Sequence, residues 1–422
     1  MKFIHAADIH LDSPLVGLAS YPDAPTERLR TATREAFTNL VSEALREVVD
    51  FVVIAGDLYD GTWKDFNTGI FFAREMGRLN QAGIPAYVLY GNHDAENATT
   101  NRLPLPENVY VFDPRTPTTH RIPKLKVALH GRSFKEAATD ENLALTYPDP
   151  VPGWFNIGVL HTALEGNTAH ANYAPCSIAQ LDAKGYEYWA LGHVHQHSVV
   201  GSKSSIVFPG NLQGRNIRET GERGAVLVSF DGQQIESIER LLVDVLRWHA
   251  LEVDVTQAKD LGDAVRLARR SLEQLVAQSA ANIPLAVRVT LRGTTAAHGE
   301  LFGLEAQLRA AVIAEAAALA GDGLWIEKVK LDTAPELSAA SIATRADAIA
   351  DLQSLFAQAE SDPDFLASLQ SVLQPLTAKM PAEVVKAVPQ LDAIRTEQLQ
   401  GLVREIAPNL LAHLATAGGT VK

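Results

Sequence analysis

The sequence lacks several features that define common classes of protein. It has a single cysteine, Cys176, which excludes an internal disulfide and favours a reducing cytoplasm. No apolar run reaches the roughly 18 residues that a membrane-spanning helix requires, so we expect no membrane association. The N-terminal residues MKFIHAADIHL are interrupted by Asp8 and two histidines and lack a small-residue cleavage site, which favours a first strand over a signal peptide.

Positive charge is scarce as well. The chain has 37 lysines and arginines against 50 acidic residues, a net charge of −13, which argues against a globally basic nucleic-acid binder. A local basic groove remains compatible with this balance, because phosphate binding depends on where the positive charges lie. At 422 residues the chain is too long for one compact core and fits two or three domains, without repeats of the solenoid type.

The first 240 residues alternate short apolar runs with helical patterns. Four runs share one design, an apolar stretch followed by glycine or a polar residue: FVVIAGD (51–57), AYVLYGN (86–92), FNIGVLH (155–161) and YWALGHV (188–194). These are typical of buried strands whose carboxyl ends open into loops. Directly before the first of these runs, residues 27–50 space apolar side chains three and four apart, which predicts an amphipathic helix. The pattern indicates a layered α/β domain with its site at the strand ends.

The pattern changes after about residue 240. Residues 246–255, 284–293 and 324–333 predict three alternating strands, and helical stretches near 259–281 and 299–320 separate them. Beyond Pro335 the chain is rich in Ala and Leu, and several short helices are expected between its prolines, which are Pro363, Pro375, Pro381, Pro389 and Pro408. We therefore expect three parts: an α/β domain over 1–240, a small α+β domain over 241–334 and a helical region over 335–422.

The helical region contains an apolar stripe. In LQGLVREIAPNLLAHLA the apolar residues recur at three- and four-residue spacing, at Leu399, Val403, Ile406, Leu410 and Leu414. Such a stripe has to be buried, either on the protein's own core or on a partner. The spacing leaves both possibilities open.

Residues of metal-ligand type concentrate at the ends of the predicted strands. The first 200 residues hold 10 of the 13 histidines. Asp8 and His10 follow the first strand on the same side, and Asp57 ends the second beside a glycine. Taken singly, each is as well explained as a turn cap or a hydrogen-bonded core histidine. His5 is expected to be such a packed interior residue and His197 a solvent-facing neighbour.

Taken together, five strand ends each supply oxygen or imidazole donors. The full set is too large for one ion of ordinary coordination number: Asp8, His10, Asp57, Asn92, His161, His193 and His195. Two ions about 4 Å apart, bridged by Asp57, would use all of them. Mixed carboxylate, amide and imidazole donors without thiolate suit Mn²⁺, Fe or Zn²⁺. Asp60 is expected to support this set or to serve as a turn residue.

The ordered motifs DIH, GDLYD, GNHD, GVLHT and GHVHQ resemble the five motifs of the calcineurin-like metallophosphoesterases. More narrowly, HAADIHLDSPL, HTALEG, LGHVHQ and FPGNLQGRN resemble the SbcD/YhaO-type DNA repair nucleases of bacteria. The resemblance covers residues 1 to about 230, and the remainder only in its layout. It implies a four-layer α-β-β-α core with a small α+β capping domain and a helical C-terminal tail.

The resemblance also implies roles for single residues. It assigns Asp8, His10, Asp57 and His195 to one metal ion and Asp57, Asn92, His161 and His193 to the other, with Mn²⁺ as the usual metal. His93 is implied to stand over the scissile phosphate as an acid or charge stabiliser, and Asp60 to orient it. For Asp94 we expect a structural role in the loop, and for Gly91 a tight turn beside the ions.

The activity implied is metal-dependent hydrolysis of DNA, as a 3′-to-5′ exonuclease and as an endonuclease on single strands. The implied partners are an SbcC-like coiled-coil ATPase, docked through C-terminal helices that SAASIATRADA (338–348) would begin, and a second copy of the chain in a homodimer. Two alternatives are a phosphodiesterase or phosphatase acting on a smaller substrate, and an architectural subunit that holds DNA ends with little hydrolysis.

Two basic segments are candidates for contact with DNA. Residues 120–135 carry five basic residues and no acidic one, and residues 215–224 add three arginines beside glycines. An exposed hairpin with ordinary surface charges explains the first segment equally well. Arg215 is the best single candidate, because it follows FPGNLQG directly after the metal-bearing strands. The other candidates are Arg218, Lys124, Lys126 and Arg132.

Overall fold

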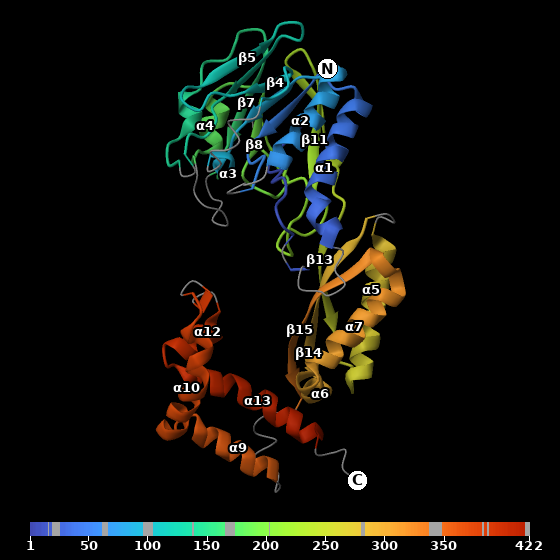
Figure 1. Cartoon of the computed structure of the whole chain (residues 1–422), viewed down its shortest axis with the longest axis vertical. Coiled ribbons are helices and arrows are strands. Elements are labelled where there is room, and N and C mark those ends of the chain that lie inside the picture. Colours follow the sequence, from blue (N-terminus) through green and yellow to red (C-terminus); the bar gives the residue numbers. More distant parts are fainter. Residues whose placement is uncertain are drawn as a thin grey trace. The chain divides into compact units, whose positions relative to one another are not determined.

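The computed structural model describes residues 1–15, 17–18, 26–60, 66–95, 104–136, 139–164, 174–201, 203–279, 283–336, 348–381, 384–385 and 388–417. Contacts between Cα atoms divide the chain into two compact units (Figure 1). The first comprises Met1–His249 with Ile283–Ala286, and the second comprises Ala250–Asn282 with Val287–Lys422. Among the described helices, none combines the length and the apolar character needed to cross a membrane.

The first unit contains two six-stranded sheets. One sheet has the order β12-β11-β1-β2-β3-β4, with bounds β1 Lys2–Ala6, β2 Phe51–Ala55, β3 Ala86–Leu89, β4 Val109–Val111, β11 Gly224–Asp231 and β12 Gln234–Leu242. The other has the order β5-β6-β7-β8-β10-β9, with bounds β5 Thr118–Ile122, β6 Val127–Gly131, β7 Phe155–His161, β8 Tyr188–Gly192, β9 Ser198–Val200 and β10 Ser205–Phe208. The helical segments of this unit are α1 Thr26–Glu47, α2 Phe66–Gln81, α3 Asn92–Ala95, the 3-10 helix η2 Leu143–Thr146 and α4 Ile178–Ala183.

The two sheets pack face to face over a shared apolar core. Phe3 and Phe51 of the first sheet join Phe155 and Tyr188 of the second in one buried cluster. Helices α1 and α2 cover the other face of the first sheet, while η2 and α4 pack on the second. This α-β-β-α layering confirms the predicted fold class. Strands β2 and β7 are buried along their whole length, which explains their continuous apolar sequences.

Parallel pairing positions the site. Strands β1, β2 and β3 run parallel to one another, and so do β6, β7 and β8. The carboxyl ends of parallel strands therefore lie at one edge of each sheet, and the polar residues predicted to follow them come together there.

The second unit begins with a three-stranded sheet of order β13-β14-β15. Its strands are β13 Arg247–Asp254, β14 Leu285–Thr295 and β15 Leu324–Pro335, and its helical segments are α5 Leu261–Gln278, α6 His298–Gly303, α7 Glu305–Ala320 and the 3-10 helix η3 Gly321–Gly323. The Asp260 carboxylate accepts a hydrogen bond from the Asp263 backbone N–H and caps the start of α5. The predicted strands and helices of this region are all present.

The C-terminal region forms helices α9 Ala348–Ala359, α10 Pro363–Ala378, α12 Pro389–Arg395 and α13 Leu399–Ala417. Pro363 and Pro389 stand in the first turns of their helices, where proline is favoured. The expectation that short helices lie between the prolines is wrong at Pro375 and Pro408, which lie inside α10 and α13. Each removes one backbone donor, and the rest of the helix is retained around it.

Helix α13 packs on α6 within the second unit. The His298 ring contacts Asn409 Oδ1 through Nε2 at 3.1 Å, and His413 Nδ1 donates to the Gly299 carbonyl at 2.8 Å. Leu399 and Leu411 are buried, whereas the predicted stripe members Ile406 and Leu414 are exposed. The predicted stripe is therefore wrong in part, because the helix turns a different face to its neighbours. Most of SAASIATRADA lies outside the described residues.

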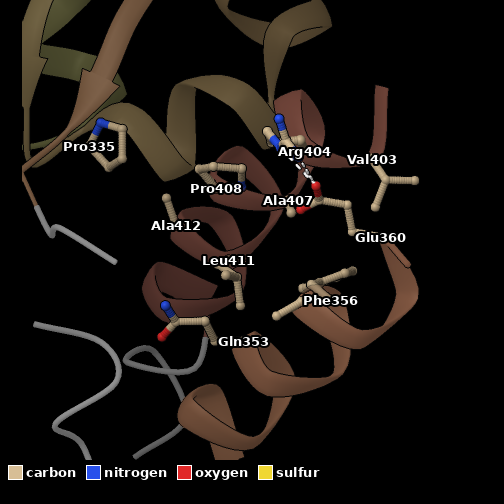
Figure 2. A pocket seen from close by; sticks show the side chains of 11 residues that line it. Pro335, Gln353, Phe356, Glu360, Val403, Arg404, Ala407, Pro408, Leu411 and Ala412 are labelled. Carbon is tan, nitrogen blue, oxygen red and sulfur yellow. Dashed lines mark hydrogen bonds and ion pairs between the residues drawn. The ribbon is translucent and has the colours of Figure 1, made fainter. Parts of the chain in front are cut away.

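A hollow of about 220 Å³ lies between α9 and α13, beside the end of β15 (Figure 2). Phe356, Leu411 and Ala412 line it with apolar surface, and the ion pair of Arg404 with Glu360 stands at its side. The residues that line it are mostly apolar.

Candidate metal centre

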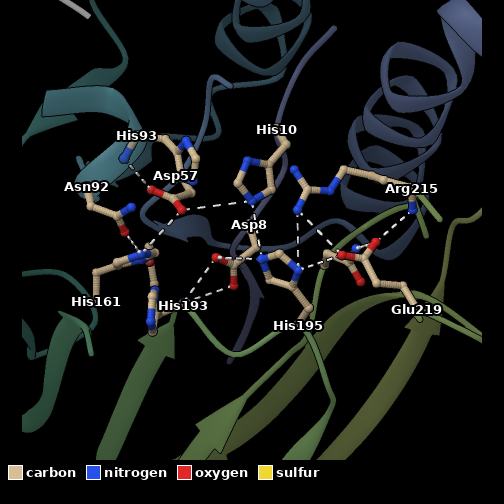
Figure 3. A network of polar contacts seen from close by, with 12 residues as sticks. Asp8, His10, Asp57, Asn92, His93, His161, His193, His195, Arg215 and Glu219 are labelled. Carbon is tan, nitrogen blue, oxygen red and sulfur yellow. Dashed lines mark hydrogen bonds and ion pairs between the residues drawn. The ribbon is translucent and has the colours of Figure 1, made fainter. Parts of the chain in front are cut away.

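Five loops at the carboxyl ends of β1, β2, β3, β7 and β8 bring the predicted donors together (Figure 3). Four of these residues have a left-handed backbone: φ is 50° at Asp8, 46° at His10, 52° at Asp57 and 93° at His193. L-residues other than glycine rarely adopt this conformation, and it persists where the surrounding structure requires it. The strained loops aim these side chains into a common space.

Glycines give these side chains room. A Cβ at Gly91 would lie 2.3 Å from Asp57 Oδ1, and a Cβ at Gly192 would lie 1.9 Å from the Ala55 carbonyl oxygen. Gly91 is not among the residues with positive φ, so its backbone conformation alone does not require glycine. It is needed for close approach of the backbone to the Asp57 carboxylate.

One donor group surrounds Asp8. Both Asp8 carboxylate oxygens accept from the His193 backbone N–H at 3.0 Å, which fixes the carboxylate at the end of β8. His195 Nε2 lies 3.9 Å from Asp8 Oδ1 and 3.3 Å from His10 Nε2. Asp8, His10 and His195 can thus place one ligand atom each around a common point.

The second donor group surrounds Asp57. His161 Nε2 lies 3.4 Å from Asp57 Oδ2 and 3.1 Å from Asn92 Oδ1. The His193 ring stands next to the His161 ring, with centroids 5.2 Å apart. Asp57 Oδ2 is also 3.8 Å from His10 Nε2. The Asp57 carboxylate therefore stands between the two groups.

The tautomer of the His161 ring determines which of its nitrogen atoms faces the other candidate metal ligands. His161 Nδ1 donates to the Ala55 carbonyl at 3.0 Å, so the neutral ring presents an Nε2 lone pair to Asp57 and Asn92. Acceptor atoms that converge in this way repel one another unless a cation or a proton lies among them. The donors are oxygen and imidazole without thiolate, and they fit divalent metal ions of the Mn²⁺, Fe or Zn²⁺ type.

The pKa values of the buried carboxylates and imidazoles also reflect how close these groups lie to one another. Burial raises the pKa of the Asp8 carboxyl to about 6 and lowers that of His10 to about 4. Burial alone would also raise the pKa of Asp57, but His161, His10 and His93 together hold it well below its usual range. Burial opposes the charged form of His161, yet the Asp57 carboxylate outweighs it and raises the His161 pKa to about 9. A proton is thus held where a cation would bind.

His93 lies beside this cluster, and the centroid of its ring is 5.1 Å from that of the His10 ring. Its backbone N–H donates to Asp57 Oδ1 at 3.1 Å, while its side chain is 37% exposed. Its Nδ1 lies 3.7 Å from Asp60 Oδ1. The same Asp60 oxygen is 3.4 Å from His10 Nδ1 and 3.5 Å from Arg215 Nη1, so Asp60 is shared among three cationic or imidazole groups.

Two neighbours have purely structural contacts. Asp94 accepts hydrogen bonds from the backbone N–H groups of Leu58, Tyr59 and Gly91, which confirms its expected role in holding the loops. His5 is buried between Tyr188 and Leu191, also as expected. His197, expected to face solvent, is partly buried and donates to the Phe208 carbonyl at 3.0 Å.

Glu219 is a residue that the sequence patterns did not indicate. Its Oε1 accepts from His195 Nδ1 at 2.8 Å, although Glu219 follows the last predicted donor by 24 residues. The only available signal was its place shortly after FPGNLQGRN. Arg215 lies beside it, with Nη2 at 3.4 Å from Glu219 Oε1.

The candidate DNA-contacting residues lie in different parts of the first unit. Arg215 borders the donor cluster, and Arg218 is exposed on the same loop. Arg132 follows β6 and pairs with Glu141 at 3.3 Å. Lys124 and Lys126 precede β6, where the Phe155 N–H donates to the Lys126 carbonyl at the start of β7. His161 ends β7 six residues later, so these lysines lie about 20 Å from the donor cluster, at the opposite edge of the sheet.

Comparison with known proteins gives consistent results. The pattern of the calcineurin-like phosphoesterases matches residues 1–197, and that of the middle domain of metallophosphoesterase YhaO matches residues 248–334. The metallophosphoesterase YhaO of Bacillus subtilis is 34% identical over 298 residues, covering 70% of this chain and 72% of that protein.

Two more distant relatives carry the name DNA double-strand break repair protein Mre11. That of Methanopyrus kandleri is 26% identical over 263 residues, covering 55% of this chain and 54% of the relative. That of Sulfurisphaera tokodaii is 25% identical over 239 residues, covering 54% and 60%. With its ordered motifs, its two-sheet fold and these matches, the chain belongs to the calcineurin-like metallophosphoesterases and, among them, to the YhaO family.

Proposed function

We propose that this metallophosphoesterase is a two-metal-dependent DNA nuclease. Asp8, His10, Asp57 and His195 would hold one ion and Asp57, Asn92, His161 and His193 the other, with Mn²⁺ as the metal. The observation that carries the proposal is the place of the Asp57 carboxylate, 3.4 Å from His161 Nε2 and 3.8 Å from His10 Nε2. A single carboxylate between two donor groups is the arrangement that a pair of ions about 4 Å apart requires.

The bound ions would supply an activated water and neutralise charge on the phosphoryl oxygens. The remaining steps belong to side chains of the chain. His93 stands next to the donors with an exposed ring, and it would give a proton to the leaving oxygen of the phosphodiester. Asp60, 3.7 Å from His93 Nδ1, would orient that ring so that Nε2 faces the substrate. Arg215 borders the same cluster and would contact a phosphate oxygen of the DNA.

Similarity to two DNA double-strand break repair proteins supports DNA as the substrate. We propose 3′-to-5′ exonuclease activity and endonuclease activity on single strands, with Arg218 and Arg132 as further contacts along the strand. The positions of Lys124 and Lys126, about 20 Å away, restrict them to a distant part of a long DNA.

The parts of the chain beyond the metal centre would serve this substrate and a partner. We propose that residues 1–240 form the nuclease domain, that 241–334 form a capping domain that binds DNA, and that the helical region 335–422 docks an SbcC-like coiled-coil ATPase. We further propose that the chain acts as a homodimer in the cytoplasm. The apolar side chains of α10 that remain exposed, among them Phe365 and Val372, support a docking role.

One experiment tests the activity and separates the alternatives. The purified chain would be assayed with Mn²⁺ on duplex DNA, on single-stranded DNA and on bis-p-nitrophenyl phosphate. A DNA nuclease cleaves all three, or the two DNA substrates preferentially. Hydrolysis of the small diester alone would indicate a small-substrate phosphodiesterase, and DNA binding without cleavage would indicate an architectural subunit. Either result would refute the proposal.

A further inference from the structure

We infer that Glu219 is a positioning residue that fixes the tautomer and orientation of His195, so that His195 Nε2 presents its lone pair to one of the two metal ions. The inference rests on the proposed two-metal site. Glu219 lies outside the ordered motifs, and its effect is transmitted through the imidazole ring that it contacts.

The hydrogen bond between the two side chains sets the tautomer. Glu219 Oε1 lies 2.8 Å from His195 Nδ1, and a carboxylate accepts hydrogen bonds but does not donate them. The proton of the neutral ring therefore resides on Nδ1, and Nε2 carries the lone pair. That Nε2 points at the donor cluster, 3.3 Å from His10 Nε2 and 3.9 Å from Asp8 Oδ1.

Every partner of Glu219 is a hydrogen-bond donor, so the site selects a carboxylate over an amide. Oε2 accepts from Asn211 Nδ2 at 2.9 Å and from the Arg215 backbone N–H at 2.7 Å. Oε1 accepts from His195 and from Arg215 Nη2. The side-chain amide of a glutamine at this position would place its NH₂ group against hydrogen-bond donors whichever way it is oriented. The carboxylate is almost fully buried, and these charge-assisted bonds compensate its desolvation.

The loop that carries Glu219 is itself held firmly. Gln213 Oε1 accepts from the Val245 N–H, and its Nε2 donates to the Leu246 carbonyl at 2.7 Å. Trp248 is fully buried, and its indole N–H donates to the Gly214 carbonyl at 2.8 Å. The Glu219 carboxylate is therefore presented by a fixed backbone, which is what a positioning residue needs.

The test compares Glu219→Gln and Glu219→Ala with the matched control Glu239→Gln, a substitution of the same charge on the exposed side of β12. Mn²⁺ binding is measured by titration calorimetry and by metal analysis. The His195 tautomer is read from ¹H–¹⁵N spectra of histidine-labelled, metal-free protein, with the signal assigned by His195→Gln. Thermal unfolding of the metal-free chains reports whether each variant folds.

We expect the Glu219 variants to weaken one of the two Mn²⁺ sites by about 10- to 100-fold while the other keeps its affinity. The Nδ1–H signal of His195 should be lost in Glu219→Ala, and DNA cleavage should recover as the Mn²⁺ concentration is raised, with KM for DNA unchanged. The control should match the wild type in all readouts.

Two outcomes would overturn the inference. One is an unchanged Mn²⁺ affinity with His195 still protonated at Nδ1 in both variants. The other is equal loss of both sites together with a lower unfolding temperature, which would make Glu219 a structural residue. Should the wild type bind two Mn²⁺ ions and leave DNA intact, the proposed nuclease activity fails, while the metal and tautomer readouts still decide the role of Glu219.

Discussion

Replacing His93 by alanine separates catalysis from metal binding more cleanly than any other single change. The His93 side chain is 37% exposed, and its Nδ1 lies 3.7 Å from Asp60 Oδ1. A partly exposed pair at this distance contributes little, so we expect the free energy of unfolding to change by less than about 1 kcal/mol. The hydrogen bond to Asp57 is donated by the His93 backbone N–H, so His93→Ala keeps it. Both metal ions should therefore remain bound.

The catalytic effect should depend on the leaving group. A general acid contributes about 10²- to 10⁴-fold, or about 3 to 5 kcal/mol of the activation free energy, when the leaving oxygen needs a proton. The alkoxide leaving group of DNA needs one, whereas p-nitrophenolate departs without it. His93→Ala should thus slow DNA cleavage by at least about 100-fold and slow hydrolysis of bis-p-nitrophenyl phosphate far less.

The assay measures kcat on both substrates at saturating Mn²⁺, together with the metal content of each chain. Asn92→Ala provides the comparison, because Asn92 Oδ1 lies 3.1 Å from His161 Nε2 inside the donor group and its removal should lower metal content. Equal metal loss in His93→Ala and Asn92→Ala would show that His93 is a ligand. Equal slowing of both substrates would show that His93 stabilises charge and does not donate a proton.

Four further predictions rest on the geometry of the metal centre and of α13. Asp57→Asn removes the negative charge of the ligand that the two ions would share. The amount of bound Mn²⁺, measured by metal analysis, should therefore fall, and DNA hydrolysis should largely vanish. A variant that keeps two Mn²⁺ ions and near-wild-type activity would disprove the bridging role of Asp57. Because the Asp57 carboxylate raises the His161 pKa to about 9, the proton on His161 competes with the metal, and Mn²⁺ affinity should rise about tenfold between pH 7 and pH 8 and level off near pH 9. Calorimetric affinities that stay flat over this interval would contradict that assignment. A chain ending at residue 334 should bind two Mn²⁺ ions and cleave DNA but fail to co-purify with the ATPase, and its second unit should melt earlier because α13 no longer covers α6. Leu411→Ala in the full chain should destabilise that unit by about 2 to 5 kcal/mol, with the exposed Leu414→Ala as a near-neutral control, and equal effects of the two would show that α13 does not pack as described.

The sequence determined the layered fold and the membership of the donor cluster. An apolar run that ends in a polar residue is a local pattern, and Asp57, Asn92 and His161 each follow such a run. Parallel strands place their carboxyl ends at one edge, so residues separated by more than 100 positions could be expected to meet before any contact was known. The packed position of His5 was predictable for the same reason, since His5 lies within the buried strand β1.

Only the tertiary structure decided contacts that no strand end dictates. Glu219 reaches His195 because the loop after β10 is held in place by Trp248, a long-range contact with no trace in the local pattern. The basic run 120–135 looks continuous in the sequence, yet the β5–β6 hairpin directs Lys124 and Arg132 to opposite edges of the sheet. The face that α13 buries was likewise settled by its neighbour α6, because an alanine-rich helix offers several apolar faces and packing selects among them.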